Sequence, residues 1–527
     1  MTGPSIHTLG ELRTSGYKVR SVKDEMRQNL LSKIAKGENT FPGVHGYERT
    51  VIPALHNAIL SKHDIILLGL RGQAKTRILR SLTMLLDDFV PVVAGCEIND
   101  SPFDPSCKRC RRLAAEKGED LPITWMARDE RYREKLATPD VTVADLVGDI
   151  DPIKAANQRL TYADEEVIHY GIIPRTNRGI FAINELPDLA PRIQVALLNI
   201  LEERDLQIRG FPVRIPMDIV LVFSANPEDY TSRGNIITPL KDRIDSQILT
   251  HYPQNIETAR RITEQEAWVE RSAQATIEIP VYVRDLIENI AFAARESELV
   301  DQSSGVSARL TIAALELLQS NLERRAAVTG DKFVFPRLSD LAMVLPAITG
   351  KVEMVYEGEQ QGSEVVARKL IGTAVAKLFE SRFPPIERAG RQAEKRYEID
   401  SDDMDDAFAS RRKQQKKAPP APPKQEQAAQ KTEPNYEAIL GWFVEGNKVT
   451  LSDELPFAKY FEEIKRVPKL ADTASKYVKA ARDEEQAFWR EMILEGLHRA
   501  LRLAREDLDS TITFQELMKF NVLRTVR

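Results

Sequence analysis

The sequence is poor in cysteine and contains no long apolar run. Only three cysteines occur among its 527 residues, which excludes a disulfide scaffold and favours the reducing cytoplasm as its compartment. No apolar stretch approaches the about 20 residues that a membrane-spanning helix needs, and residues 1–20 lack the apolar core of a signal peptide. The net charge is only −5, so no overall attraction to nucleic acid or to an anionic membrane is expected.

A phosphate-binding loop is predicted where the first apolar run ends. Ile65 to Leu68 is short enough for a buried strand, and Arg77 to Leu86 has the pattern of a helix. The loop between them carries Lys75 and Thr76, which would neutralise the β- and γ-phosphates and hold Mg²⁺, respectively. Ala74 stands where such loops usually have glycine, which weakens the match. The residues expected to contact the nucleotide are Gly69, Leu70, Arg71, Gly72, Gln73, Ala74, Lys75, Thr76 and Arg77.

A second buried strand is predicted at Ile180 to Ile183, and it ends in Asn184 and Glu185. A phosphate-hydrolysing site needs an acidic residue here to organise the waters of Mg²⁺ and a second carboxylate to polarise the attacking water. Glu185 is available as the base. Asn184 stands where the first of these acidic residues is needed. Together with Thr76 it forms the predicted Mg²⁺ site, but its amide carries no charge. We therefore expect weaker Mg²⁺ binding or slower hydrolysis than with aspartate.

Three further polar residues follow later in the chain. Asn226 comes after a third buried strand and could orient the lytic water. Arg243 could stabilise the transferring phosphate on a neighbouring subunit; the alternative is a surface ion pair with Asp242 or Asp245. Arg309 lies in the first turn of a predicted helix, from which it could reach the γ-phosphate.

The cysteines have a spacing that suits a metal. Cys107 and Cys110 form a CxxC pair, and Cys96 could supply a third thiolate to a zinc ion. The fourth ligand would have to be Asp100, Asp104 or a distant histidine. The alternative is three free thiols in an irregular loop.

Two hairpins and one turn are also predicted. The hairpins span about 138–175, with strand-like runs at 159–162 and 167–174, and about 204–217. The first hairpin is either a surface elaboration or a moving loop that touches a partner, and the second has its turn at Gly210. The turn-rich stretch 41–47 precedes a helix and would place backbone beside an adenine ring, unless it is an ordinary connection.

The chain divides into five predicted regions. An N-terminal arm (1–40) precedes an α/β nucleotide-binding core with hairpin insertions (41–255) and a small all-α lid domain (256–383). A charged, proline-rich linker (384–434) then leads to a helical C-terminal module (435–527), which is expected to serve partners.

Together these motifs resemble the AAA+ ATPases, and within them the MoxR and magnesium-chelatase ATPase-subunit group. The resemblance covers roughly residues 40–380. It implies a three-layer P-loop core with a parallel sheet, in which residues 69–76 are Walker A and residues 180–185 are Walker B. It further implies that Asn226 is sensor 1, Arg243 the arginine finger and Arg309 sensor 2.

The same resemblance implies an ATPase that uses ATP and Mg²⁺, assembles as a hexameric ring and remodels a partner protein with a von Willebrand factor A domain. One alternative is the ATPase subunit of a true magnesium chelatase, which inserts Mg²⁺ into a porphyrin. Another is a non-hydrolysing, nucleotide-dependent scaffold, which Ala74 and Asn184 would allow. A transcription-activating ATPase is disfavoured, because no helix-turn-helix or basic DNA-binding face is visible.

Overall fold

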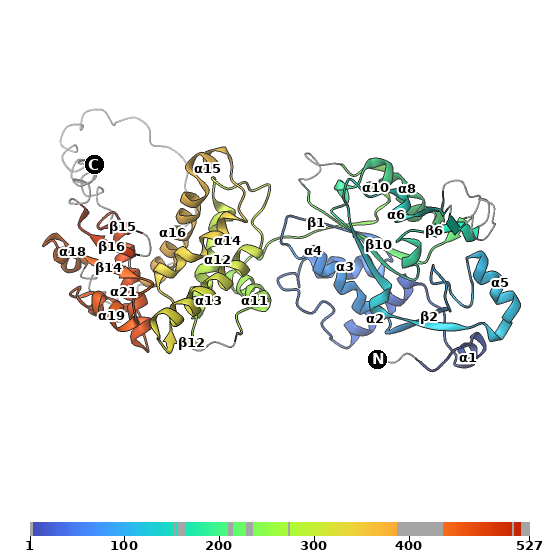
Figure 1. Cartoon of the computed structure of the whole chain (residues 1–527), viewed down its shortest axis with the longest axis horizontal. Helices are drawn as coiled ribbons and strands as arrows, with labels where there is room; N and C mark the ends of the chain where they lie inside the picture. The colour runs from blue at the N-terminus through green and yellow to red at the C-terminus, as the bar shows by residue number, and fades with distance from the viewer. Residues whose placement is uncertain are drawn as a thin grey trace, which may run out of the picture. The chain divides into compact units, whose positions relative to one another are not determined.

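A computed structural model of the chain divides into two compact units (Figure 1). The described residues are 4–151, 153–154, 165–208, 214–227, 235–271, 275–386, 436–508 and 511–517. Unit 1 comprises Met1–Gln265 and Gln302–Ala308, and unit 2 comprises Glu266–Asp301 and Arg309–Arg527. Most of the predicted lid domain falls in unit 2 together with the C-terminal module, whereas residues 256–265 and 302–308 of that predicted lid belong to unit 1. Most of the predicted linker lies outside the described residues.

The centre of unit 1 is a five-stranded sheet in the order β11-β1-β10-β7-β4, in which all neighbouring strands are parallel. The three strands predicted from apolar runs are β1, β7 and β10. The bounds of the five strands are β1 Ile65–Leu68, β4 Tyr132–Leu136, β7 Gly179–Asn184, β10 Ile219–Ala225 and β11 Ser246–Leu249. The predicted α/β class with a parallel sheet is confirmed.

Both faces of this sheet are buried, as parallel sheets require. Alternate residues along β1 enter different cores: Ile65 and Leu67 pack in one hydrophobic cluster with α2 and α3, whereas Ile66 and Leu68 pack in the other with α8. Figure 1 shows α2, α3 and α4 on one side of β10, with α8 and α10 on the other. The helices of unit 1 are α1 Leu9–Thr14, α2 Val22–Ala35, α3 Val51–Leu60, α4 Lys75–Ser81, α5 Lys108–Lys117, α6 Val143–Leu146, α8 Pro191–Glu202, α10 Thr238–Arg243 and α11 Ile256–Glu266, with short 3-10 turns between several of them.

The residues predicted as an N-terminal arm take part in the core of unit 1. Helix α2 begins after Ser21, whose side chain accepts a hydrogen bond from the Asp24 N–H and so caps the first turn. Three apolar side chains of this helix are buried, namely Val22, Met26 and Leu30. Burial of such side chains stabilises the fold by about 1.5–3 kcal/mol each, so this segment is an integral layer of unit 1.

Three antiparallel strand pairs surround the main sheet. β2 (Phe89–Val93) pairs with β3 (Ile123–Ala127), and β8 (Asp205–Gln207) pairs with β9 (Arg214–Pro216). The second pair is the hairpin predicted at about 204–217. β5 (Gly148–Ile150) pairs with β6 (Ile168–Tyr170), so the earlier hairpin forms with a different first strand from the one predicted. The predicted run at 159–162 and the predicted turn at Gly210 lie outside the described residues.

Unit 2 is largely helical but also contains strands. A pair of two-residue strands, β12 (Thr276–Ile277) and β13 (Phe333–Val334), interrupts the region predicted as all-α. The C-terminal module adds a three-stranded antiparallel sheet, β14 (Val449–Ser452), β16 (Thr511–Gln515) and β15 (Ala504–Leu508), which the prediction of a helical module did not include. The helices are α12 Val281–Glu296, α13 Arg309–Thr329, α14 Leu345–Thr349, α15 Tyr356–Gln361, α16 Ser363–Arg382, α18 Tyr436–Val444, α19 Phe457–Lys465, α20 Leu470–Tyr477 and α21 Asp483–Arg499, together with the 3-10 helix η7 Leu338–Val344.

The predicted lid domain and C-terminal module are joined by buried polar contacts. Arg337 Nη1 donates to the Ser452 carbonyl oxygen at 2.8 Å, and the Leu338 N–H donates to Glu491 Oε2 at 2.9 Å. The Arg337 and Glu491 side chains are both buried, and buried polar groups of this kind are costly to separate from their partners. We infer that the C-terminal module packs on the lid helices and is not tethered by the linker alone.

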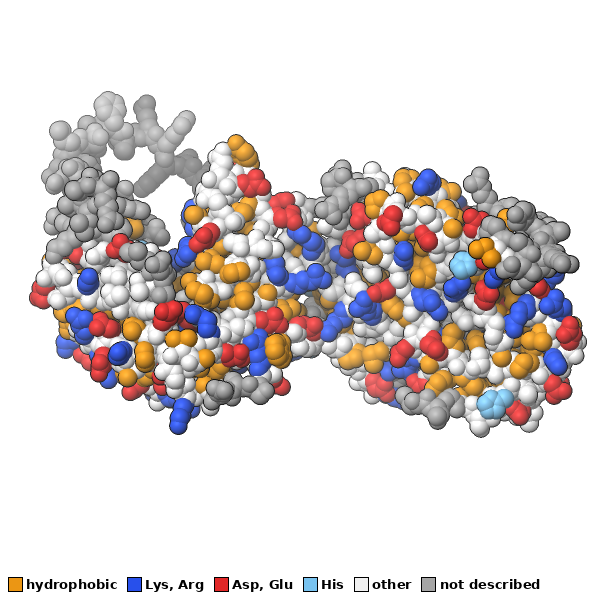
Figure 2. Space-filling model, viewed as in Figure 1, with side chains coloured by type: hydrophobic (Ala, Val, Ile, Leu, Met, Phe, Trp, Pro, Cys, Tyr) orange, Lys and Arg blue, Asp and Glu red, His pale blue; other side chains and the backbone are white. Residues whose placement is uncertain are grey.

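Helix hydropathy and the charges on one face of the surface bear on the expectations from composition. Among the described residues, no helix combines the length and the apolar character that a bilayer crossing demands. On the face shown in Figure 2, Lys and Arg side chains are interspersed with Asp and Glu over both units. This view agrees with the near-neutral charge balance of the sequence.

Candidate functional site

The predicted nucleotide-binding residues meet at the carboxyl edge of the main sheet. Leu68 of β1 pairs with Ala225 of β10, and Phe223 of β10 pairs with Ile183 of β7. The Gly69 N–H continues this register and donates to the Ala225 carbonyl oxygen at 3.1 Å. The phosphate-binding loop, Asn226 and the end of β7 therefore lie side by side, which is where open α/β sheets bind ligands.

The loop after β1 encloses the Lys75 side chain. Lys75 is only 8% exposed, and its Nζ donates to the carbonyl oxygens of Gly69 and Leu70, the latter at 3.1 Å. A Cβ at Gly69 would lie 1.9 Å from Thr250 Oγ1, so only glycine fits at this point. A buried ammonium group in a loop that leads into a helix N-terminus is suited to binding a polyphosphate.

Residues outside the loop hold it in shape. Thr250 Oγ1, just beyond β11, donates to the Gln73 side chain at 2.7 Å, and the Tyr47 hydroxyl donates to the Gln73 carbonyl oxygen at 2.9 Å. The Tyr252 hydroxyl donates to the Arg71 carbonyl oxygen at 2.8 Å. Burial raises the pKa of Tyr47 to about 12, so its hydroxyl stays a donor at neutral pH. Sequence reasoning pointed to the stretch around Tyr47 but missed Thr250 and Tyr252, which only the pairing of β11 with β1 brings here.

Two residues of the loop have left-handed backbone conformations. Gly72 has φ +73°, and a Cβ there would lie 2.2 Å from Ser307 Oγ, so the segment 302–308 closes over it. Ala74 has φ +58° and precedes the first residue of α4. This is the position where glycine is usual, and alanine adopts it at a steric cost of about 1–2 kcal/mol. Arg309 follows Ala308 along the chain and begins α13 of unit 2, so its predicted contact with nucleotide stays a prediction.

The strain at Ala74 leads to a first prediction. Ala74→Gly should raise the free energy of unfolding of unit 1 by about 1 kcal/mol, because glycine occupies the left-handed region without a Cβ clash. The matched control is Ala196→Gly in the middle of α8, which should lower it by about the same amount. Urea denaturation of the full chain measures both, and a loss of stability in the Ala74 variant would contradict the argument.

The end of β7 presents the second group of predicted residues. Ser224 links them: its Oγ donates to Asn184 Oδ1 at 3.1 Å and accepts from the Glu185 N–H at 3.3 Å. Glu185 itself has φ +55°, a conformation that is rare outside glycine and is concentrated at functional sites. Asn226 is buried and follows the last residue of β10. The chain thus brings the predicted base, the predicted metal residue and the predicted sensor to neighbouring strand ends.

A carboxylate that sequence reasoning missed lies next to Asn184. Glu134 projects from β4, and its pKa is lowered by hydrogen bonds from Arg80 and Tyr132 and from the Asn184 side chain. Arg80 reaches it from α4, with Nε 3.0 Å from Glu134 Oε2. The β4 sequence is polar and gave no motif, so the parallel pairing of β4 with β7 was needed to find this residue. Glu134 and Arg80 thus form an ion pair close to the end of β7.

The turn at 41–47 lies against the start of α4. Arg77 Nη1 donates to the Gly43 carbonyl oxygen at 3.1 Å, and the Gln265 side chain donates to the same oxygen at 3.1 Å. His45 Nε2 forms a 2.8 Å hydrogen bond with Gln265. The turn is therefore fixed beside the helix that follows the phosphate-binding loop, where the expected contact with adenine stays a prediction.

Arg243, the last residue of α10, is held by a residue that the sequence did not suggest. Its guanidinium lies 2.6 Å from Glu202 Oε2 of α8, and its Nη1 donates to the Pro239 carbonyl oxygen at 3.0 Å. The predicted alternative was an ion pair with Asp242 or Asp245, whereas the ion pair that the structure describes for Arg243 is with Glu202. The Arg243 side chain remains 30% exposed.

The three cysteines gather at a second place in unit 1, together with one of the predicted fourth ligands. The thiols of Cys96, Cys107 and Cys110 and a carboxylate oxygen of Asp100 all lie within 4.8 Å of one another. None of the three thiols is in a disulfide. Asp104, the other aspartate considered from the sequence, is exposed and outside this group.

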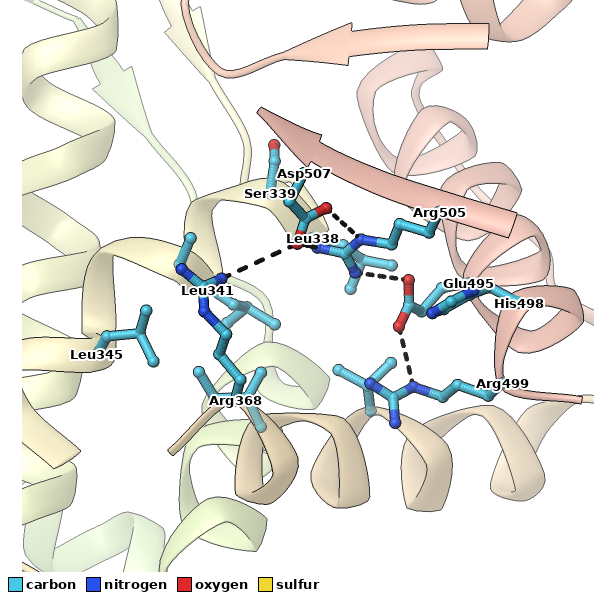
Figure 3. A pocket seen from close by; sticks show the side chains of 13 residues that line it. Leu338, Ser339, Leu341, Leu345, Arg368, Glu495, His498, Arg499, Arg505 and Asp507 are labelled. Carbon is cyan, nitrogen blue, oxygen red and sulfur yellow. Dashed lines mark hydrogen bonds and ion pairs between the residues drawn. The ribbon is translucent and has the colours of Figure 1, made fainter. Parts of the chain in front are cut away.

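A cavity in unit 2 has a different character. It has a volume of about 220 Å³ and is lined by α16, α21, β15 and η7 residues. Figure 3 shows its charged side chains facing one another: Arg505 contacts Glu495 at 2.7 Å and Asp507 at 2.7 Å, and Arg499 contacts Glu495 at 2.9 Å. Both carboxylates of this group are therefore engaged in ion pairs with arginines.

Comparison with known proteins identifies the middle of unit 1. Residues 124–244 match the profile of the AAA domain (dynein-related subfamily), a range that includes Glu185, Asn226 and Arg243 but begins after the phosphate-binding loop. A magnesium-chelatase subunit ChlI homolog of Methanocaldococcus jannaschii is 25% identical over 233 residues, which are 42% of this chain and 59% of that protein. The magnesium-chelatase 67 kDa subunit of Heliobacterium mobile is 26% identical over 202 residues, which are 37% of this chain and 29% of that protein.

The matches are partial in length. The chain spans 29–59% of the length of these two curated relatives. Among solved structures, a complex between the magnesium-chelatase subunits BchI and BchD aligns with a TM-score of 0.28 and 18% identity, over 65% of this chain and 97% of the matched chain.

Proposed function

We propose that this chain, which matches the AAA domain over residues 124–244 and is similar to magnesium-chelatase subunits, binds ATP with Mg²⁺ and hydrolyses it to drive changes in a partner protein. One observation carries the proposal. The loop around the buried Lys75 lies beside Glu185 and Asn226 at adjoining strand ends. That arrangement provides a polyphosphate cradle next to a carboxylate, which is what phosphoryl transfer to water requires.

Each of three side chains has its own role in this reaction. Lys75 exchanges its contacts with the Gly69 and Leu70 carbonyl oxygens for contacts with phosphate oxygens. Glu185 accepts a hydrogen bond from water and orients it for attack, and Asn226 holds that water and the terminal phosphate in line.

The residues present fit a magnesium ion, with one departure. The Thr76 hydroxyl would bind the ion, and Asn184 would accept a hydrogen bond from its water shell. When bound, Mg²⁺ neutralises the charge that develops on the transferring phosphate. Asn184 is neutral, and the nearby Glu134 is already paired with Arg80 of α4. We therefore expect Mg²⁺ to bind more weakly than it would with an aspartate at position 184.

Arg243 and the hairpins extend the proposal to an assembly. We propose a ring, hexameric by family resemblance, in which Arg243 of one subunit stabilises the phosphate bound to its neighbour. The β5–β6 and β8–β9 hairpins would transmit the nucleotide cycle to the partner, for which a von Willebrand factor A domain is the proposed fold. A nucleotide-gated scaffold is the second candidate, favoured by the strained Ala74 and the uncharged Asn184.

Mg²⁺-dependent release of phosphate from ATP tests the proposal. The wild-type chain should release phosphate steadily. Lys75→Ala should bind ATP about 10- to 100-fold more weakly, because a charge-assisted contact is worth about 1.5–3 kcal/mol. The exposed Lys117→Ala is the matched control and should bind ATP like the wild type. Tight binding without phosphate release in the wild type would favour the scaffold over the ATPase.

A further inference from the structure

The cysteine cluster of unit 1 lies apart from the nucleotide-binding residues of the sheet edge and has the composition of a metal site. Cys96 follows β2, Asp100 lies in the next loop, and Cys107 and Cys110 stand at the start of α5. In a tetrahedral zinc site, bonds of about 2.3 Å to sulfur and about 2.1 Å to oxygen separate the ligand atoms by about 3.6–3.8 Å. Four ligand atoms within 4.8 Å of one another need only small movements to reach that geometry.

The state of Asp100 is an independent observation that points to a cation. Asp100 is 1% exposed. Its Oδ2 accepts from the Cys107 N–H at 2.9 Å, but Oδ1 is buried and accepts no hydrogen bond from the described residues. Burial of an unpaired carboxylate oxygen is costly, and coordination of a metal removes that cost.

The backbone around the sulfurs favours thiolates. The Asp100 N–H donates to Cys96 Sγ and the Cys110 N–H donates to Cys107 Sγ, both at 3.3 Å. Cys107 is the N-cap of the ten-residue helix α5, where the partial positive charge of the helix end stabilises an anionic sulfur. N–H groups that donate to the ligand atoms are typical surroundings of a bound metal.

We propose that Cys96, Asp100, Cys107 and Cys110 bind one zinc ion. Three thiolates with one carboxylate in a tetrahedral arrangement select zinc over the harder cations Mg²⁺ and Ca²⁺. Protein ligands fill all four positions, and three of the four residues are buried, so the site is structural.

The ion would brace one of the two inserted hairpins. The Lys108 N–H, next to the ligand Cys107, donates to Glu165 Oε1 at 2.8 Å, and Arg112 pairs with Glu166 at 2.9 Å. Glu165 and Glu166 lead directly into β6, whose Tyr170 hydroxyl also contacts Glu165 at 3.4 Å. Zinc fixes the start of α5, and α5 in turn fixes the second strand of the β5–β6 hairpin.

Metal analysis of the purified full chain, prepared under reducing conditions without added metal, tests the assignment. We expect about one equivalent of zinc, since structural sites are normally filled. Less than about 0.2 equivalents, with no uptake after zinc is added, would overturn the proposal, and so would stoichiometric iron in place of zinc.

Two aspartate variants separate the ligand from its neighbour. Asp100→Ala should lower zinc affinity at least about tenfold, measured by competition with a chromogenic chelator, because even the loss of an outer partner costs that much. Asp104→Ala, four residues away and exposed, should retain wild-type affinity. Equal affinities in the two variants would remove Asp100 from the site.

Cobalt substitution of the wild-type chain provides a measurement that does not depend on the folding of a variant. Co²⁺ bound by three thiolates should give an intense thiolate-to-cobalt charge-transfer band and tetrahedral d–d bands. The absence of these bands in chain that has been stripped of metal and reloaded with Co²⁺ would overturn the tetrahedral thiolate site.

Discussion

Glu185→Gln should lower the rate of Mg²⁺-dependent ATP hydrolysis by a factor of about 10² to 10⁴, the usual contribution of a general base. Glutamine keeps the size of the side chain and its hydrogen-bonding capacity but cannot accept a proton. Affinity for ATP should change little, because Lys75 and the loop backbone make the phosphate contacts. Single-turnover phosphate release and equilibrium ATP binding, measured on the same preparation, separate the two effects.

Glu203→Gln is the matched control for this experiment. Glu203 is exposed at the C-terminal end of α8, and its loss of charge should leave hydrolysis unchanged. If Glu185→Gln and the wild type hydrolyse ATP at the same rate, another carboxylate is the base. Glu134, which lies on β4 next to β7, would then be the first residue to replace.

Arg243→Ala should reduce turnover by a factor of about 10³ to 10⁵, the range measured for arginine fingers. A guanidinium stabilises charge on the transferring phosphate that no neutral side chain replaces. Arg243→Lys should recover only part of the rate, because lysine lacks the planar fork that binds two oxygens. Arg192→Ala, an exposed arginine at the start of α8, should behave like the wild type.

A mixture of two inactive variants tests whether Arg243 acts on a neighbouring subunit. In a ring, a site with intact Glu185 in the Arg243→Ala chain can receive Arg243 from an adjacent Glu185→Gln chain. Activity should therefore return on mixing, although each variant alone is inactive. Failure to recover activity, with mixed assembly shown by cross-linking, would place the action of Arg243 within its own chain or remove it from catalysis.

The ion pair between Arg243 and Glu202 must break if Arg243 is to contact a phosphate on a neighbouring subunit. Within one chain, Glu202 of α8 engages the guanidinium at 2.6 Å, so the arginine is positioned at the end of α10 before any neighbour is present. An exposed ion pair of this kind contributes only about 0–1 kcal/mol. It can therefore be exchanged for a phosphate without a large loss in stability.

Local sequence patterns were sufficient to predict the central strands. β1, β7 and β10 are buried on both faces, so they consist of continuous apolar runs that are visible without any knowledge of the fold. β4 was not predicted because it contains the charged residues Arg133, Glu134 and Lys135. Such residues are tolerated there because β4 is an edge strand of the sheet. The strands of the C-terminal sheet were missed for a similar reason: β15 carries three charged residues in a row, and its pairing with β16 is antiparallel and local to that module.

The cysteines show where prediction from sequence stops. CxxC spacing predicts a metal because two thiols one helical turn apart can share one ion. The choice among Asp100, Asp104 and a histidine could not be made from spacing, since it depends on how the loop after β2 folds against α5. The tertiary structure selects Asp100 and leaves one of its oxygens without a hydrogen bond among the described residues.

The sequence by itself determined the features that depend on short stretches of chain: the strand-loop-helix around Lys75, the polar ends of the strands at Glu185 and Asn226, and the cysteine pair. Tertiary structure alone decided which distant residues join them. It brought Thr250 to the phosphate-binding loop, Glu134 to Asn184 and Asp100 to the thiols. The physical reason is that these contacts arise from the parallel order of the strands and from the packing of loops on the core, which are properties of the whole chain and leave no periodic or spaced signal near the residues themselves.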